Sequence, residues 1–120
     1  MGIKSLDFHE GILTWTITGQ LNQPDLAAAQ KAAADFIRKN GRIRILVVAE
    51  DFAGWAKTGD WGDLSFQMDN DRNIIKVAVV VDRKWEDLVN VFIGKGLRQF
   101  PVECFQPSEK GKARQWLDET

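Results

Sequence analysis

A compact apolar run, Ile43 to Val48, is interrupted only by Arg44 and lies between two stretches whose apolar residues recur at helical spacing. Such a run predicts a strand that is buried on both faces of a parallel or mixed sheet. Polar residues follow it, beginning with Glu50 and Asp51. Because ligands and partners of open α/β sheets usually meet the loops at the carboxyl ends of the strands, we look for function from Glu50 onward.

The other elements are predicted from periodicity and from turn and cap residues. In chain order, we expect two antiparallel strands within Ile3–Leu21 joined by a turn at His9–Gly11, a helix over Pro24–Asn40 and the strand at Ile43–Val48. A short helix beginning near Trp61 and a strand over Ile74–Val81 follow. The chain ends with a helix that begins after its N-cap Asp82 and stops at Gly94, an edge strand over Gln99–Phe105 and a last helix capped by Ser108. The order ββαβαβαβα predicts one α/β domain over residues 1–120, with a mixed five-stranded sheet and about four helices.

Several side chains are expected in the core. Leu13, Trp15 and Ile17 alternate with threonines, which predicts one buried and one wetter strand face. The third helix is expected to bury a stripe made of Trp85, Leu88, Val89, Phe92 and Ile93. Pro101 cannot donate a ladder hydrogen bond, so the strand that contains it is placed at a sheet edge.

Charge and composition exclude several classes of protein. With 16 basic and 17 acidic residues the net charge is −1, which gives no overall field to attract nucleic acid. No apolar run approaches the roughly 20 residues of a membrane helix, so no membrane insertion is expected. Cys104 is the single cysteine and cannot form an internal disulfide. These features, and the absence of a signal-like N-terminus, predict a cytoplasmic protein.

No set of residues predicts catalysis. His9, the one histidine, lies in a predicted hairpin turn without a nucleophile beside it. Glu50, Asp51 and Asp82 are expected to cluster at the carboxyl edge of the sheet, but a phosphoryl-transfer site also needs a nucleophile, a positioned lysine and a phosphate loop. We therefore interpret Asp82 as a helix cap and Glu50 and Asp51 as solvated loop residues. No catalytic residue, metal site or cofactor is predicted.

Four short strings together resemble the SpoIIAA-like family of small bacterial proteins: DFAGW at 51–55, WGDLSF at 61–66, VAVVVDRKW at 77–85 and WL at 116–117. That family is placed with the STAS domains (sulfate transporter and anti-sigma factor antagonist) and shares a topology with CRAL-TRIO lipid-transfer domains. The resemblance implies a non-enzymatic regulatory module that acts by protein contact. The antagonists carry a phospho-acceptor serine in an Asp-Ser-Ser-Gly type motif, which this sequence lacks. Thr58 is the only hydroxyl between Glu50 and Trp61, and it is either a helix cap or a phospho-acceptor.

Aromatic residues gather where a site is expected, because large rings with one polar N–H anchor interfaces and line apolar pockets. The predicted binding residues are Asp51, Phe52, Trp55, Trp61, Phe66 and Trp85. Their favoured use is docking of a protein partner or of a second copy as a homodimer. The alternative is carriage of a small apolar or lipid-like ligand. A cavity of about 300 Å³ or more lined by the tryptophans would favour the ligand.

Overall fold

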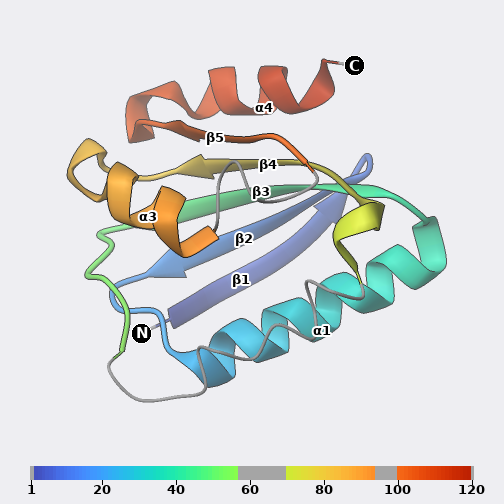
Figure 1. Ribbon diagram of the computed structural model, residues 1–120, viewed down its shortest axis with the longest axis horizontal. Coiled ribbons are helices and arrows are strands. Elements are labelled where there is room, and N and C mark those ends of the chain that lie inside the picture. The colour runs from blue at the N-terminus through green and yellow to red at the C-terminus, as the bar shows by residue number, and fades with distance from the viewer. Residues whose placement is uncertain (1, 57–69, 94–99, 120) are drawn as a thin grey trace.

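The structure, a computed structural model, describes residues 2–56, 70–93 and 100–119 (Figure 1). The strands are β1 (Gly2–His9), β2 (Ile12–Thr18), β3 (Ile43–Glu50), β4 (Ile74–Val80) and β5 (Val102–Phe105). The α-helices are α1 (Gln23–Asn40), α3 (Glu86–Ile93) and α4 (Lys110–Asp118), with short 3-10 turns η1 (Asp71–Asn73), η2 (Arg83–Trp85) and η3 (Pro107–Glu109). The predicted helix near Trp61 lies outside the described residues.

The strands form one sheet in the order β1-β2-β3-β4-β5. β1 and β2 pair antiparallel, and every later neighbour pairs parallel, which confirms the predicted mixed five-stranded sheet. β5 is an edge strand, as Pro101 indicated. It begins at Val102 rather than at Gln99, because Pro101 can offer the ladder only its carbonyl, which accepts a hydrogen bond from the Val77 N–H at 3.1 Å.

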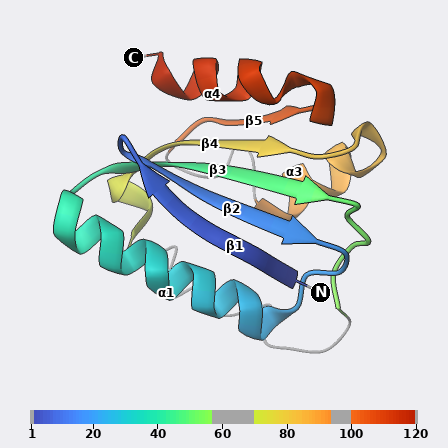
Figure 2. The ribbon, with the colours of Figure 1, turned by 180° about the vertical axis from the view of Figure 1, so that it is seen from behind.

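Helices cover both faces of the sheet, which Figures 1 and 2 show from opposite sides. On one face α1 and α3 contribute Ala29, Ala33, Ile37 and Val89 to the larger core. On the other face α4 contributes Ala113 and Leu117, which pack on alternate residues of β3 and β4. The central strand β3 and its neighbour β4 are therefore covered on both sides, as the apolar run Ile43–Val48 predicted for β3.

Local sequence signals place the ends of α1 as expected. The side chain of Asn22 caps the helix by accepting a hydrogen bond from the Asp25 N–H at 2.9 Å. At the other end, Gly41 adopts a φ of 81°, and its N–H donates to the Ile37 carbonyl at 2.7 Å. The hairpin turn between β1 and β2 is likewise left-handed at Glu10 and Gly11.

Two predictions about the last two helices are wrong. Ser108 does not cap α4, because it lies inside η3, where Gln106 and Glu109 form a capping box and the Gln106 N–H donates to Glu109 Oε1 at 3.0 Å. The predicted buried stripe of the third helix is also too wide. Val89 is buried and Trp85 and Ile93 pack half-buried against the core, but Leu88 and Phe92 are exposed, because the sheet covers only part of the stripe.

Candidate functional site

The chain leaves β3 at Asp51, where φ is 48°, an unusual left-handed conformation for a residue other than glycine. The exposed Asp51 carboxylate and the half-buried Phe52 ring follow each other at this turn. Phe52 packs against the larger core together with Trp55 and Trp85. The turn therefore leaves a charged and an aromatic group at the carboxyl end of β3.

Four rings form an aromatic cluster made of Phe52, Trp55, Trp85 and Phe92. Phe52 lies edge-to-face against Trp55 and against Trp85, with ring centroids 5.1 Å apart in both pairs. The Trp55 ring lies 6.2 Å from Trp85 and 5.0 Å from Phe92. Edge-to-face pairs contribute about 0.5–1.5 kcal/mol beyond their buried area. The structure thus joins three predicted site residues and adds Phe92, which the sequence placed in a buried stripe.

Backbone contacts hold the loop that carries Trp55. The Leu21 N–H donates to the Gly54 carbonyl at 2.9 Å, and the Ala56 N–H donates to the Leu21 carbonyl at 2.8 Å. Gly54 has a φ of 92°, and a Cβ built on it would lie 3.2 Å from the Trp85 ring. Glycine is thus required here by both conformation and space.

The indole N–H groups of Trp55 and Trp85 are buried, and neither has a hydrogen-bond acceptor among the described residues. A buried donor without a partner costs about 1–3 kcal/mol. The cluster is consequently held by ring packing, with no help from its polar N–H groups.

An apolar cavity of about 90 Å³ lies between the sheet, α1 and α3. Trp15, Trp55 and Phe92 are among its lining residues, and all of its lining residues are apolar. Pockets for drug-sized ligands usually hold about 300–1,000 Å³. This cavity is therefore too small for a lipid-like molecule, although it has room for a small apolar group.

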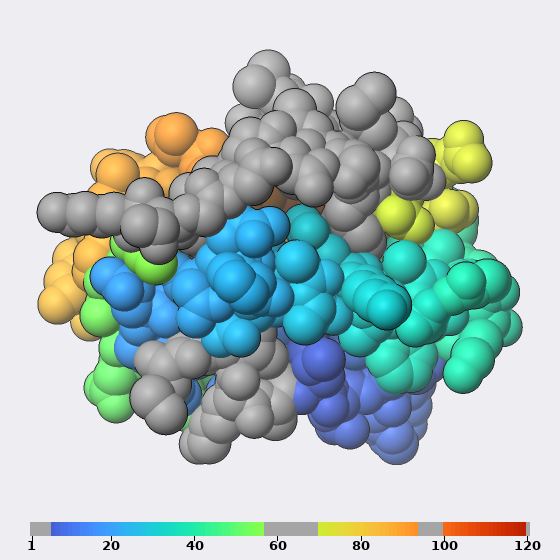
Figure 3. Space-filling model, turned by 90° about the horizontal axis from the view of Figure 1, so that it is seen from below, coloured from blue at the N-terminus to red at the C-terminus, as the bar shows by residue number. Residues whose placement is uncertain are grey.

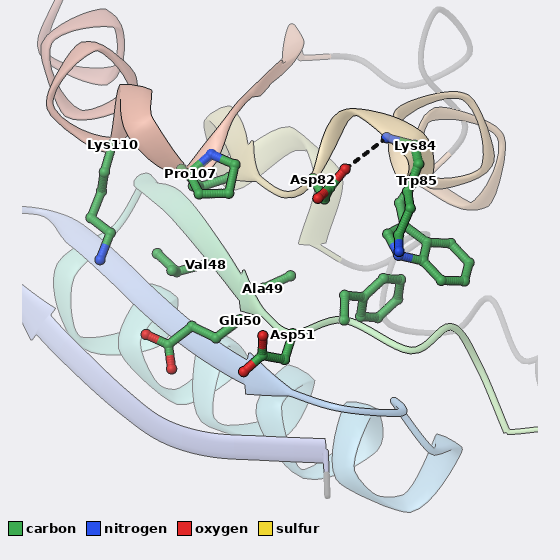
Figure 4. Close-up of a pocket in the computed structure, with 11 residues that line it drawn as sticks. Val48, Ala49, Glu50, Asp51, Asp82, Lys84, Trp85, Pro107 and Lys110 are labelled. Carbon is green, nitrogen blue, oxygen red and sulfur yellow. Dashed lines mark hydrogen bonds between the residues drawn. The ribbon is translucent and has the colours of Figure 1, made fainter.

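A second, charged cavity of about 380 Å³ lies at the carboxyl ends of β3 and β4 (Figure 4). Glu50, Asp51 and Asp82 all line it, which confirms that these carboxylates cluster. Lys84 and Lys110 also line it, and the sequence reasoning missed both. Lys110 begins α4, 59 positions after Asp51 in the printed sequence, so only the fold brings them together.

Asp82 acts as a cap, as predicted. One of its carboxylate oxygens accepts a hydrogen bond from the Lys84 N–H at 3.1 Å. In the part of the chain that the structure describes, no three histidine, cysteine, aspartate or glutamate side chains are grouped so that they could hold a metal ion.

The outer side of α3 is apolar. Leu88, Val91 and Phe92 are 54%, 79% and 39% exposed, and they share one helix face because they are spaced by three and four residues. We call these three residues the α3 patch. Among the described residues only one other large apolar side chain, Leu6, is comparably exposed. Since Phe92 also contacts Trp55, the α3 patch is continuous with the aromatic cluster.

Three predicted site residues, Thr58, Trp61 and Phe66, lie outside the described residues. Figure 3 views the molecule from the side of α1 and draws these segments in grey. His9 is the exposed last residue of β1, next to Glu10 of the hairpin turn and far along the sequence from the other site residues. The Cys104 thiol lies 3.3 Å from the side-chain oxygen of Asn90.

The fold defines a class of protein, a small α/β domain whose mixed sheet is covered by helices on both faces. Residues 12–118 match the model of the SpoIIAA-like family, and the chain belongs to that family. A similar solved structure is an uncharacterized protein of the DUF3478 family with a SpoIIAA-like fold, from Shewanella loihica PV-4. The two sequences are 17% identical, the match covers 97% of this chain and 93% of the Shewanella chain, and the TM-score is 0.71. No curated protein matches the sequence.

The family and the neighbour define the fold and name no activity. No helix among the described residues has the length and apolar character needed to cross a membrane.

Proposed function

We propose that the protein is a non-enzymatic binding module of the anti-sigma factor antagonist type, which acts by docking a protein partner on the α3 patch. The observation that carries this proposal is the exposure of Leu88, Val91 and Phe92 on one face of an eight-residue helix. Exposed apolar side chains that gather on one face are typical of interaction sites. The aromatic cluster beneath them supplies rigid rings of the kind that anchor interfaces.

Charge indicates what kind of partner fits. α3 contains Glu86 and Asp87 and no basic residue, so the rim of the α3 patch is acidic on this helix. A partner with apolar side chains flanked by lysine or arginine would be complementary in both respects.

Site-specific photo-crosslinking tests the docking site. A photoreactive residue at Val91 should capture one protein partner in the cells that make this chain, and the same residue at exposed Lys112 on α4 should not. Capture from position 91 should be lost in Leu88→Ser. Capture that survives Leu88→Ser, or equal capture from both positions, overturns the proposal. Capture of a second copy of the chain would make the patch a homodimer interface. Sedimentation velocity would then show a dimer for the unchanged protein and a monomer for Val91→Lys.

The second candidate function is carriage of a small apolar molecule in the apolar cavity. The observation in its favour is that all lining residues are apolar, from Trp15 on β2 to Ile93 on α3. An empty apolar cavity of about 150 Å³ is known to bind benzene, and the cavity here is smaller. NMR titration with cyclopentane is the test. Shifts confined to cavity methyl groups, and lost in the filling variant Ala49→Val, support it, whereas no saturable shift removes it.

A further inference from the structure

The charged cavity has the size and position of a small-molecule site. Its volume of about 380 Å³ falls within the range of about 300–1,000 Å³ that is usual for ligand pockets. It is built from the ends of two parallel strands and the start of α4 (Figure 4). Ligands of open α/β sheets bind outside the carboxyl ends of the strands. The cavity also lies apart from the α3 patch, since none of the three patch residues lines it.

Charges of both signs face this cavity. The carboxylates of Glu50, Asp51 and Asp82 and the ammonium groups of Lys84 and Lys110 belong to lining residues. Among the described residues, no salt bridge joins the carboxylate of Asp51 or Asp82 to either of these lysines. Opposite charges that share a cavity without pairing leave both free for a ligand that carries both signs.

Each side of the cavity holds charges of both signs. In Figure 4, Lys110 extends from the start of α4 on the side toward which Glu50 points, and Asp82 lies on the other side beside Lys84 and Trp85. Phe52 and Trp85 add aromatic rings to the lining, and ring faces attract both apolar groups and ammonium groups. The lining can thus meet a cationic and an anionic group of one ligand at the same time, with aromatic rings for an apolar body on the side of Asp82.

We infer that the charged cavity is a binding site for a small zwitterion of the amino-acid class. The ligand's ammonium group lies against Asp51 and Asp82, its carboxylate against Lys110, and its side chain against Phe52 and Trp85. A diamine would bring a second cation toward the two lysines, and a dicarboxylate would meet the three acidic side chains. The zwitterion is the one of the three that satisfies both sets of charges.

Matched probes test the charge requirement. We would titrate the isotope-labelled protein with phenylalanine, phenethylamine and 3-phenylpropanoate, which share a ring and differ in the charges they carry. Phenylalanine should bind at least about threefold more tightly than either singly charged probe, since exposed charge pairs are individually weak. Resonances of residues around Asp82 and Lys110 should shift. Equal affinity for a singly charged probe, or no saturable shift with phenylalanine or any other free amino acid at millimolar concentration, overturns the inference.

Two charge variants identify the partners of each end. Asp82→Asn keeps the cap, because asparagine caps helices as well as aspartate does. The variant should weaken the binding of phenylalanine and phenethylamine about three- to fivefold and leave the binding of 3-phenylpropanoate unchanged. Lys110→Gln should weaken phenylalanine and 3-phenylpropanoate and leave phenethylamine unchanged. Lys31→Gln, on exposed α1 surface away from the cavity, is the matched control. Equal effects of a variant on all three probes would contradict the assigned ends.

Discussion

α3 and α4 are short helices of similar length that each follow a parallel strand and cover opposite faces of the sheet. They differ in the side chains that they expose to solvent. α4 buries Ala113 and Leu117 and turns charged and polar residues outward. It is also tied to the sheet by Lys76, whose Nζ donates to the Trp116 carbonyl at 2.8 Å and lies 4.6 Å from the Trp116 ring centroid. α3 buries Val89 and exposes Leu88 and Val91.

The difference teaches which helix serves stability and which is available for binding. The outer side of α4 has the composition of an ordinary solvated surface. The outer side of α3 has apolar side chains, Leu88 and Val91, that the fold leaves mostly exposed. Substitutions on the two helices should therefore separate loss of stability from loss of binding.

The largest expected effect comes from a matched pair of leucines. Leu117→Ala on α4 removes a fully buried side chain and should lower the free energy of unfolding by about 2–5 kcal/mol, because it leaves a cavity. Leu88→Ala on α3 should change it by less than about 0.5 kcal/mol, because that side chain is mostly exposed. Urea denaturation followed by circular dichroism measures both. Similar losses in the two variants would contradict the comparison.

An intermediate effect is expected at the loop under the aromatic cluster. Gly54→Ala imposes a left-handed conformation on alanine and brings its Cβ to 3.2 Å from the Trp85 ring, so it should destabilise the fold by about 1–3 kcal/mol. Gly111→Ala in α4 is the control, since a Cβ there meets nothing and should be neutral or stabilising. Thermal unfolding compares the two. A neutral Gly54→Ala would show that the loop does not depend on this contact.

The smallest effect concerns pH and the start of α4. The Gln106 N–H that donates to Glu109 lowers the pKa of this carboxyl below its usual value of 4.5, and Lys112 nearby lowers the pKa further. The stability contributed by this carboxylate should thus be fully present above the unfolded pKa and be lost as pH falls through the folded pKa. Because the side chain is still partly open to solvent, the change should be slight. Glu109→Gln should flatten the stability profile below pH 4.5, and an unchanged profile would contradict it.

Much of the fold could be predicted from particular residues. Asn22, Pro24 and Gly41 set the ends of α1 through local hydrogen bonds and backbone conformation. The apolar run Ile43–Val48 predicted a strand buried on both faces, and Pro101 predicted the edge strand. These signals act within a few residues, so they can be read without knowing what lies across the sheet.

The candidate site was predicted only in part. The clustering of Glu50, Asp51 and Asp82 could be foreseen because parallel strands end at the same edge of the sheet. Lys84 and Lys110 could not, since helical or turn residues give no signal of the cavity they border. Phe92 was predicted to be buried and is partly exposed, because a stripe of apolar residues does not reveal how much of the stripe the sheet can cover.

The sequence by itself determined the order of the elements, the strands of the inner sheet and the caps of the first helix, since short-range backbone preferences and alternation of apolar residues act locally. Only the tertiary structure decided that α3 would keep an apolar side exposed, that four rings would meet above the sheet, and that lysines from η2 and α4 would face the carboxylates. Those outcomes depend on which surfaces lie opposite each other once the chain has crossed the sheet, and this is a property of packing between segments far apart along the chain.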